Sequence, residues 1–178
     1  MQITIPKNAF LEAVASLAKV ATGKSPITSF NFIKLQANAS KQTMSMTAAD
    51  FDQIMCFDLP THVEGNLDVA DSGQQLKTLV KSPKKDGEMT LAVTDGFLEI
   101  IDDGRSLGQL PLTDEEVSFS SPEAPKDAET IILPANFSAF VNDASMCVSK
   151  DPTRVQVHGV CFSKDGITAT CLLYTSDA

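Results

Sequence analysis

Absences set the first limits on this sequence. None of its apolar runs approaches the roughly eighteen residues that a helix needs to cross a bilayer. The opening residues MQITIPKNAF lack the basic segment followed by an apolar segment that marks a secretory signal peptide. We therefore expect a cytoplasmic protein without a membrane partner. Its 43% hydrophobic and 21% charged residues are typical of a soluble globular protein.

Thiol and imidazole groups are also scarce. The 178 residues include four cysteines and two histidines, and no cysteine belongs to a Cys-x-x-Cys or Cys-x-x-His pair. His62 and His158 both lie far from any cysteine pair, so the usual zinc ligand sets are missing. Cys56, Cys147 and Cys161 have apolar neighbours, which predicts buried, reduced thiols. We expect no metal site and no cofactor.

Positive charge is in deficit. The chain has 14 Lys and Arg residues against 23 Asp and Glu residues, which gives a formal charge of −9. This balance speaks against a nucleic-acid-binding protein whose whole surface is cationic. It leaves room for a protein that gathers a few lysines on one surface.

An enzyme is one alternative, because the segment DGFLEIIDDG offers carboxylates for a divalent cation. Those carboxylates belong to Asp95, Glu99, Asp102 and Asp103. Both groups of aspartates precede a glycine, and Asp-Gly between alternating apolar runs predicts hairpin turns. No histidine lies near a plausible nucleophile, and there is no glycine-rich phosphate loop. We expect no catalytic residues and no catalytic activity.

One pattern of elements occurs three times along the chain. Each copy begins with a short alternating strand and a helix with an apolar stripe, and further strands follow. The first copy predicts a helix over 7–21 and strands at 2–5, 30–37, 41–48 and 50–59. The second copy predicts a helix over 71–82 and strands at 66–69, 88–93, 97–101 and 105–112. The third copy predicts a helix over 135–148 and strands at 130–133, 154–162 and 166–170.

The spacing of these copies indicates duplication of a β-α-β-β-β unit. Their first strands end at Ile5, Val69 and Leu133, at equal intervals of 64 residues. One unit buries too little surface to be stable, so two units should form one domain. Residues 118–129 are rich in Ser, Pro and acidic residues, which indicates a linker. The sequence thus predicts an α+β fold with helices on one face of antiparallel sheets.

Two domains and a tail follow from this reading. We expect a complete domain over 1–122 and half of a second domain over 123–170. The last eight residues, CLLYTSDA at 171–178, resemble translated sequencing adapter, so a non-native tail is predicted there. The alternative for this tail is a genuine, diverged strand.

Several motifs, in their order and spacing, resemble the bacterial sliding clamp, the beta subunit of DNA polymerase III. They are ATGKSP after the first helix, LQANASKQTMSMTAADFD, GRSLGQLPL, and ILPANFSAFVNDA followed by DPTRVQVHGVCF. The resemblance covers residues 1 to about 170 and implies the DNA-clamp fold, with helices lining a ring and strands outside. It implies a processivity factor that encircles double-stranded DNA as a homodimer and binds DNA polymerase and clamp loader subunits.

The resemblance also implies binding residues. Lys24 matches a basic DNA-contacting position, and Arg154 and Val157 match positions in a pocket for partner peptides. The other candidate DNA-binding residues are Lys19, Lys77, Lys81, Lys84 and Lys85. Lys77 and Lys81 follow Gln74 on a helix face opposite Leu76 and Val80. These lysines could instead be solvated helix faces, and a protein-interaction scaffold of the same fold that never meets DNA is the alternative function. The third helix, NFSAFVNDASMC, carries no cation.

Overall fold

The computed structural model describes residues 1–81, 86–113, 117–119, 127, 131–151, 153–163, 166–171 and 175–177. The chain divides into two compact units, Met1–Glu123 and Ala124–Ala178, each with a hydrophobic core of its own. No helix in these described ranges is long and apolar enough to cross a membrane.

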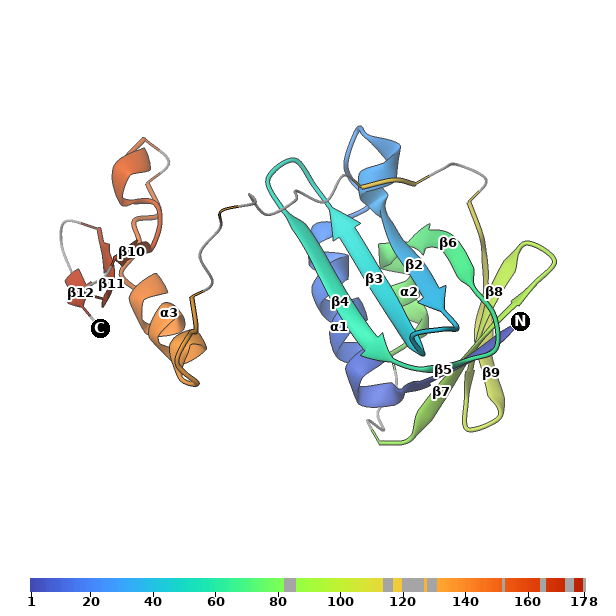
Figure 1. The fold of residues 1–178 in the computed structure, drawn as a ribbon. Coiled ribbons are helices and arrows are strands. Elements are labelled where there is room, and N and C mark those ends of the chain that lie inside the picture. The colour runs from blue at the N-terminus through green and yellow to red at the C-terminus, as the bar shows by residue number, and fades with distance from the viewer. Residues whose placement is uncertain are drawn as a thin grey trace. The chain divides into compact units, whose positions relative to one another are not determined.

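The first unit contains two modules with the same order of elements (Figure 1). Module one comprises β1 (Gln2–Pro6), α1 (Lys7–Val20), the 3-10 helix η1 (Thr28–Asn31), β2 (Phe32–Asn38), β3 (Thr43–Ala49) and β4 (Ile54–Pro60). Module two comprises β6 (Leu67–Ser72), α2 (Gly73–Leu79), β7 (Glu88–Thr94), β8 (Phe97–Asp102) and β9 (Arg105–Pro111), and β5 (His62–Val63) lies between the modules.

Each module gives its first strand to the sheet of the other. β1 lies between β5 and β7 in the sheet β5-β1-β7-β8-β9, and β6 lies beside β2 in the sheet β4-β3-β2-β6. All these pairings are antiparallel. Pro6 pairs with Glu88, and Ser72 pairs with Phe32, which are the first residues of β7 and β2. The predicted α+β architecture of duplicated units is confirmed.

The predicted interval of 64 residues between the first two modules is wrong. α1 begins at Lys7 and α2 at Gly73, which is an offset of 66 residues. The difference arises because Asp71 and Ser72, which were expected to start the helix, stay extended and pair with β2. The repeat itself is unaffected.

A single core joins both sheets to α1 and α2. Phe10, Val14 and Leu17 of α1 are completely buried, as the predicted helical stripe requires, and Leu76 of α2 packs into the same cluster. Alternate residues of the strands face this core. Each Å² of apolar surface that they bury stabilises the fold by about 25 cal/mol. In Figure 1 both helices lie behind the four-stranded sheet, and the helices therefore share one side of it.

The predicted hairpin turns are confirmed. Asp95 and Gly96 have φ values of 49° and 81°, and Asp103 and Gly104 have 50° and 76°. Positive φ at both central residues is the geometry that the twist of a two-residue hairpin favours, and Asp-Gly adopts it readily.

The prediction of buried thiols is wrong for Cys56 and Cys161, which are exposed. In β4 the side chains of Met55 and Phe57 pack against the core, so strand alternation turns Cys56, between them, toward solvent.

The second unit contains α3 (Phe137–Ser145), the 3-10 helix η2 (Val155–Val157), β10 (Cys161–Ser163), β11 (Gly166–Thr170) and β12 (Thr175–Asp177). α3 packs its apolar stripe against β11, around the buried Ala144. β12 pairs with β11, so three residues of the predicted tail are in a strand. The strand predicted over 154–162 is wrong for most of its length, because η2 replaces it and β10 begins at Cys161.

The strand predicted at 130–133 is also not formed over the described residues Ile131–Leu133. These side chains are exposed, with Ile132 at 92%. A strand needs a neighbour for its backbone hydrogen bonds, and β1, its counterpart, has one on each side. In the described part of the second unit, β10, β11 and β12 pair with one another instead.

Candidate nucleic-acid interface

The candidate interface is the side of the first unit where α1 and α2 lie next to each other. Between the two helices is a hollow of about 700 Å³. It is lined by Asn8, Leu11, Glu12, Val14, Ala15, Lys77, Val80 and Lys81. The buried Val14 and Val80 belong to its apolar part, and the two lysines and one glutamate supply its charge.

Four of the predicted DNA-binding lysines lie on or beside the helices. Lys77 is half-buried within α2, and Lys81 is exposed just after it. Lys19 is exposed in the last turn of α1, and Lys24 is exposed in the loop that follows. The hollow brings Lys77 and Lys81 together, whereas Lys19 and Lys24 are not among its lining residues. Lys84 and Lys85 lie outside the described residues.

Gln74 does not join the row of lysines as expected, because its side chain holds the end of α1. The Gln74 amide Nε2 donates hydrogen bonds to the carbonyl oxygens of Ala18, at 2.7 Å, and Ala21, at 3.2 Å. Carbonyls in the last turn of a helix lack partners within the helix, so this amide caps α1. The cap joins α2 to the segment that leads into Lys24.

Gly73 allows the two helices to approach closely at the same place. A Cβ atom on Gly73 would lie 2.8 Å from the Cβ atom of Ala21 and 3.0 Å from its carbonyl oxygen. A Cβ contact of 2.8 Å is essentially never found in proteins, so a side chain here would push α2 away from the end of α1. The geometry of the hollow therefore depends on this glycine.

A buried ion pair ties the start of α1 to the second module. Lys7 is 1% exposed, and its Nζ lies 2.6 Å and 2.7 Å from the two carboxylate oxygens of Asp102, at the end of β8. The Lys7 backbone N–H donates to the Gly87 carbonyl at 3.0 Å. Asp102 was expected in a hairpin turn, and sequence reasoning missed this pair, whose members are 95 residues apart.

Asp71 is buried at the end of β6, directly before α2. Its Oδ1 accepts a hydrogen bond from the Ser72 N–H at 2.6 Å, whereas its Oδ2 has no hydrogen-bond partner among the described residues. Burial raises the pKa of Asp71 to about 6, and the bond from Ser72 offsets part of the increase. The sequence predicted a helix that begins at Asp71. The strand pairing places it at the position that Ile5 occupies in the first module.

The carboxylates considered for a metal site are dispersed. Asp95 and Asp103 are in separate turns, and Asp102 binds Lys7. Across the described ranges, no three His, Cys, Asp or Glu side chains are grouped so that they could hold a metal ion.

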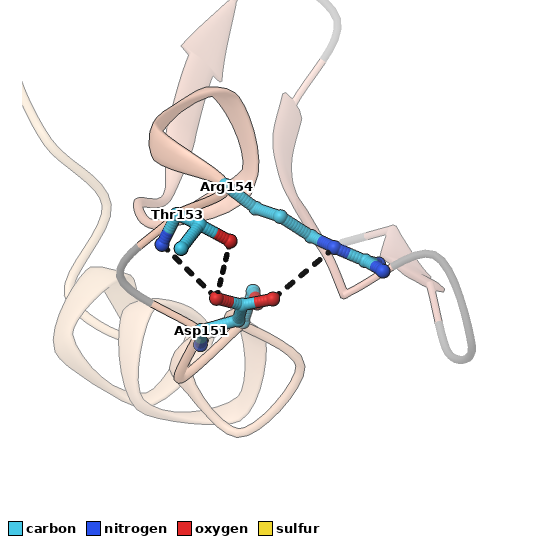
Figure 2. A network of polar contacts seen from close by, with 4 residues as sticks. Asp151, Thr153 and Arg154 are labelled. Carbon is cyan, nitrogen blue, oxygen red and sulfur yellow. Dashed lines mark hydrogen bonds and ion pairs between the residues drawn. The ribbon is translucent and has the colours of Figure 1, made fainter.

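Arg154 and Val157, the predicted peptide-pocket residues, lie in the second unit around η2. The Arg154 Nε lies 3.3 Å from Oδ2 of Asp151, and the Thr153 N–H and hydroxyl both donate to Oδ1 (Figure 2). These bonds from Thr153 lower the pKa of Asp151. Val157 is half-buried, and its carbonyl accepts from the Ser149 N–H at 3.0 Å. The Arg154 side chain is 52% exposed and so remains open to solvent.

No protein-family model and no curated protein matches the sequence. In fold, the chain is similar to the DNA polymerase III subunit beta from Pseudomonas aeruginosa, with a TM-score of 0.75 at 16% identity over 100% of this chain and 50% of that one. The sliding clamp from Bacillus subtilis gives 0.74 at 20% identity over 96% and 47%. The Helicobacter pylori beta clamp, solved with a DNA ligase peptide, gives 0.68 at 20% identity over 97% and 49%.

These similarities define the class of fold, a duplicated α+β clamp. The chain has the fold of the bacterial DNA polymerase III beta sliding clamps, and it spans about half the length of the solved structures that it matches. The resemblance drawn from the sequence motifs is thus confirmed for the fold.

Proposed function

We propose that this chain is part of a sliding clamp, a non-catalytic processivity factor that encircles duplex DNA in the cytoplasm and tethers the replicative polymerase. The observation that carries the proposal is the pairing of α1 and α2 around a hollow lined by Lys77 and Lys81, within a clamp fold. On this proposal, residues 1–122 are the N-terminal clamp domain and 123–170 the first half of the central domain.

A topological link requires little affinity. A ring that surrounds DNA cannot dissociate sideways, and strong phosphate contacts would slow its sliding. A few lysines on the inner helices are therefore sufficient, because their attraction to phosphate is independent of sequence and is screened by salt. The formal charge of −9 is compatible with this mode of binding, since the rest of the surface can remain acidic.

Closure of a ring and recruitment of partners complete the proposal. The whole protein would form a homodimer, be placed on DNA by a clamp loader and bind the polymerase through short peptides. Arg154 and Val157 would contribute to the peptide pocket, and the exposed guanidinium held by Asp151 supports this assignment. The Helicobacter pylori beta clamp was solved with a DNA ligase peptide, which is an example of such binding in a protein of this fold.

Two lysine substitutions test the DNA contact in the 178-residue chain. Binding to a fluorescent 30-base-pair duplex should be weak, independent of sequence and dependent on salt. Lys77→Gln with Lys81→Gln should reduce the slope of log K against log salt by about 2, because each phosphate contact contributes about 0.9. Lys41→Gln is the matched control, since Lys41 is exposed and lines a polar hollow among sheet residues rather than helix residues. An equal effect of Lys41→Gln would contradict the assignment.

Encirclement has its own test in a longer protein that contains this chain. Loaded onto nicked circular DNA, the protein should stay bound through high-salt gel filtration and be lost when the circle is cut. Retention on linear DNA would show ordinary binding, and no retention on either would favour the interaction scaffold.

A further inference from the structure

Two aromatic side chains, Phe30 and Phe51, pack against each other at one end of the four-stranded sheet in the first unit. The Phe51 patch consists of this ring pair, and the exposed Ile27 and Ile54 are three residues away from it in the sequence. Phe51 is 68% exposed in the turn between β3 and β4, and Ile27 and Ile54 are 41% and 40% exposed. η1 and the β3–β4 turn lie at the same end of the sheet in Figure 1. Exposed apolar patches on soluble proteins mark interaction sites.

The turn that carries Phe51 is rigidly built. The Asp50 carboxylate accepts hydrogen bonds from the backbone N–H groups of Asp52 and Gln53, both at 2.9 Å, and from the Gln53 side-chain amide at 3.0 Å. The Asp50 N–H donates to the Gln53 carbonyl at 3.0 Å. The Phe51 ring is thus presented to solvent from an ordered turn, which reduces the entropy that a partner must overcome on binding.

The neighbouring loop is equally ordered and supports the ring. Phe30 packs edge-to-face against Phe51, with ring centroids 5.1 Å apart and an interplanar angle of 86°. Asn31 exchanges two hydrogen bonds with Ser25, at 2.9 Å and 3.0 Å. The Phe30 N–H donates to the carbonyl of Ile27 at 3.1 Å, which fixes the backbone that carries Phe30.

The charges beside Phe51 are negative. Asp50 and Asp52 flank it in the turn, and Asp52 is exposed. Hydrogen bonds from the Gln53 amide and the Asp52 N–H lower the pKa of Asp50, so this carboxylate is ionised at neutral pH. Two carboxylates next to an aromatic ring repel phosphate and attract cationic side chains.

We propose that the Phe51 patch docks a protein segment that carries a bulky apolar side chain flanked by arginine or lysine. The apolar side chain would pack on the Phe51 ring that Phe30 supports, and the flanking cations would pair with Asp50 and Asp52. Aromatic anchors and complementary charge are the features that give protein interfaces their affinity and specificity. This proposal does not depend on DNA binding by the helices.

Three fluorescein-labelled synthetic peptides test the proposal on the 178-residue chain by fluorescence anisotropy. The first has a central Leu-Phe flanked by two arginines on each side, the second has glutamates in place of the arginines, and the third has serines in place of Leu-Phe. The first should bind at least about tenfold more tightly than the others. Phe51→Ala should weaken it about tenfold, whereas Phe97→Ala, which removes a 45% exposed aromatic at the start of β8 in the other sheet, should not.

Further arms separate folding and nucleic acid from peptide docking. Asp52→Asn retains Phe51 and the backbone N–H that donates a hydrogen bond to the Asp50 carboxylate. This variant should bind the arginine peptide more weakly, and its affinity should depend less on salt. Equal binding of the three peptides, or equal loss in the two phenylalanine variants, would overturn the proposal. So would a labelled fifteen-residue oligothymidylate that binds the chain, displaces the arginine peptide and loses affinity in Phe51→Ala, because the patch would then be a nucleic-acid site.

Discussion

Replacing Asp71 with asparagine should change how the stability of the first unit depends on pH. Asp71 is 1% exposed and its pKa is raised to about 6 by burial, against 3.8 for the ordinary carboxyl. The folded state therefore binds more protons than the unfolded state between these values. Stability falls as pH rises through this window, because ionising Asp71 costs more in the folded chain than in water. Asparagine cannot ionise, so the variant lacks this loss.

The size of the effect follows from the shift in pKa. A difference of one pKa unit corresponds to about 1.4 kcal/mol, so the full shift at Asp71 is worth at most about 3 kcal/mol. Roughly 2 kcal/mol of that should develop between pH 4 and pH 7, since the unfolded carboxyl is already partly ionised at pH 4. The buried amide of asparagine adds an offset of its own, but that offset does not vary with pH.

Urea unfolding followed by circular dichroism, at half-unit steps from pH 4 to pH 8, measures the difference. The free energy of unfolding of Asp71→Asn minus that of the unsubstituted chain should increase with pH and level off above pH 7. Asp68→Asn is the control, because that carboxylate is 60% exposed on the same strand. A difference that stays flat, or that decreases with pH, would refute the reasoning about burial.

Three further outcomes are expected. Asp102→Leu should destabilise the first unit by about 3–5 kcal/mol in the same urea assay, because it leaves the buried Lys7 ammonium without this carboxylate. Lys7→Met should cost less, since the Asp102 side chain is 14% exposed, and the double variant should lose less than the sum. Gln74→Ala should cost about 1 kcal/mol and accelerate amide exchange near the end of α1, whereas Gln74→Glu, which has no amide donor, should not restore the cap. Hydrogen exchange should be faster in 123–170 than in 1–122, because an exposed apolar segment without strand partners leaves the smaller unit less stable; uniform protection would contradict this.

Local chemistry explains which parts of the fold could be predicted. The helical stripe that begins at Phe10 and the Asp-Gly turn at Asp95 depend on residues close in sequence, and both were predicted correctly. Cys56 was wrongly predicted to be buried because its neighbours in the sequence are apolar. The strand alternates inward and outward side chains, and Cys56 is one of those that face solvent. The strand at Ile131–Leu133 failed because a strand needs a neighbour, which no local pattern supplies.

The candidate site also contains some residues that could be predicted from the sequence and others that could not. Lys77 and Lys81 could be selected from helical spacing, and the hollow between α1 and α2 brings them together. The roles of Gln74, Lys7 and Asp71 could not be found from sequence. Each depends on a contact with a distant element or on a strand continuing where a helix was expected. Their assignment required the pairing of the modules in space.

The exchange of β1 and β6 between the two sheets has a consequence for how the first unit can be divided. If the chain were cut between β5 and β6, the first fragment would hold β2, β3 and β4 without β6. The second fragment would hold β7, β8 and β9 without β1. Neither fragment could close its core by itself, yet each carries what the other lacks. The two pieces, expressed together, should therefore find one another and restore the unit, which would make this loop a natural site for fragment complementation.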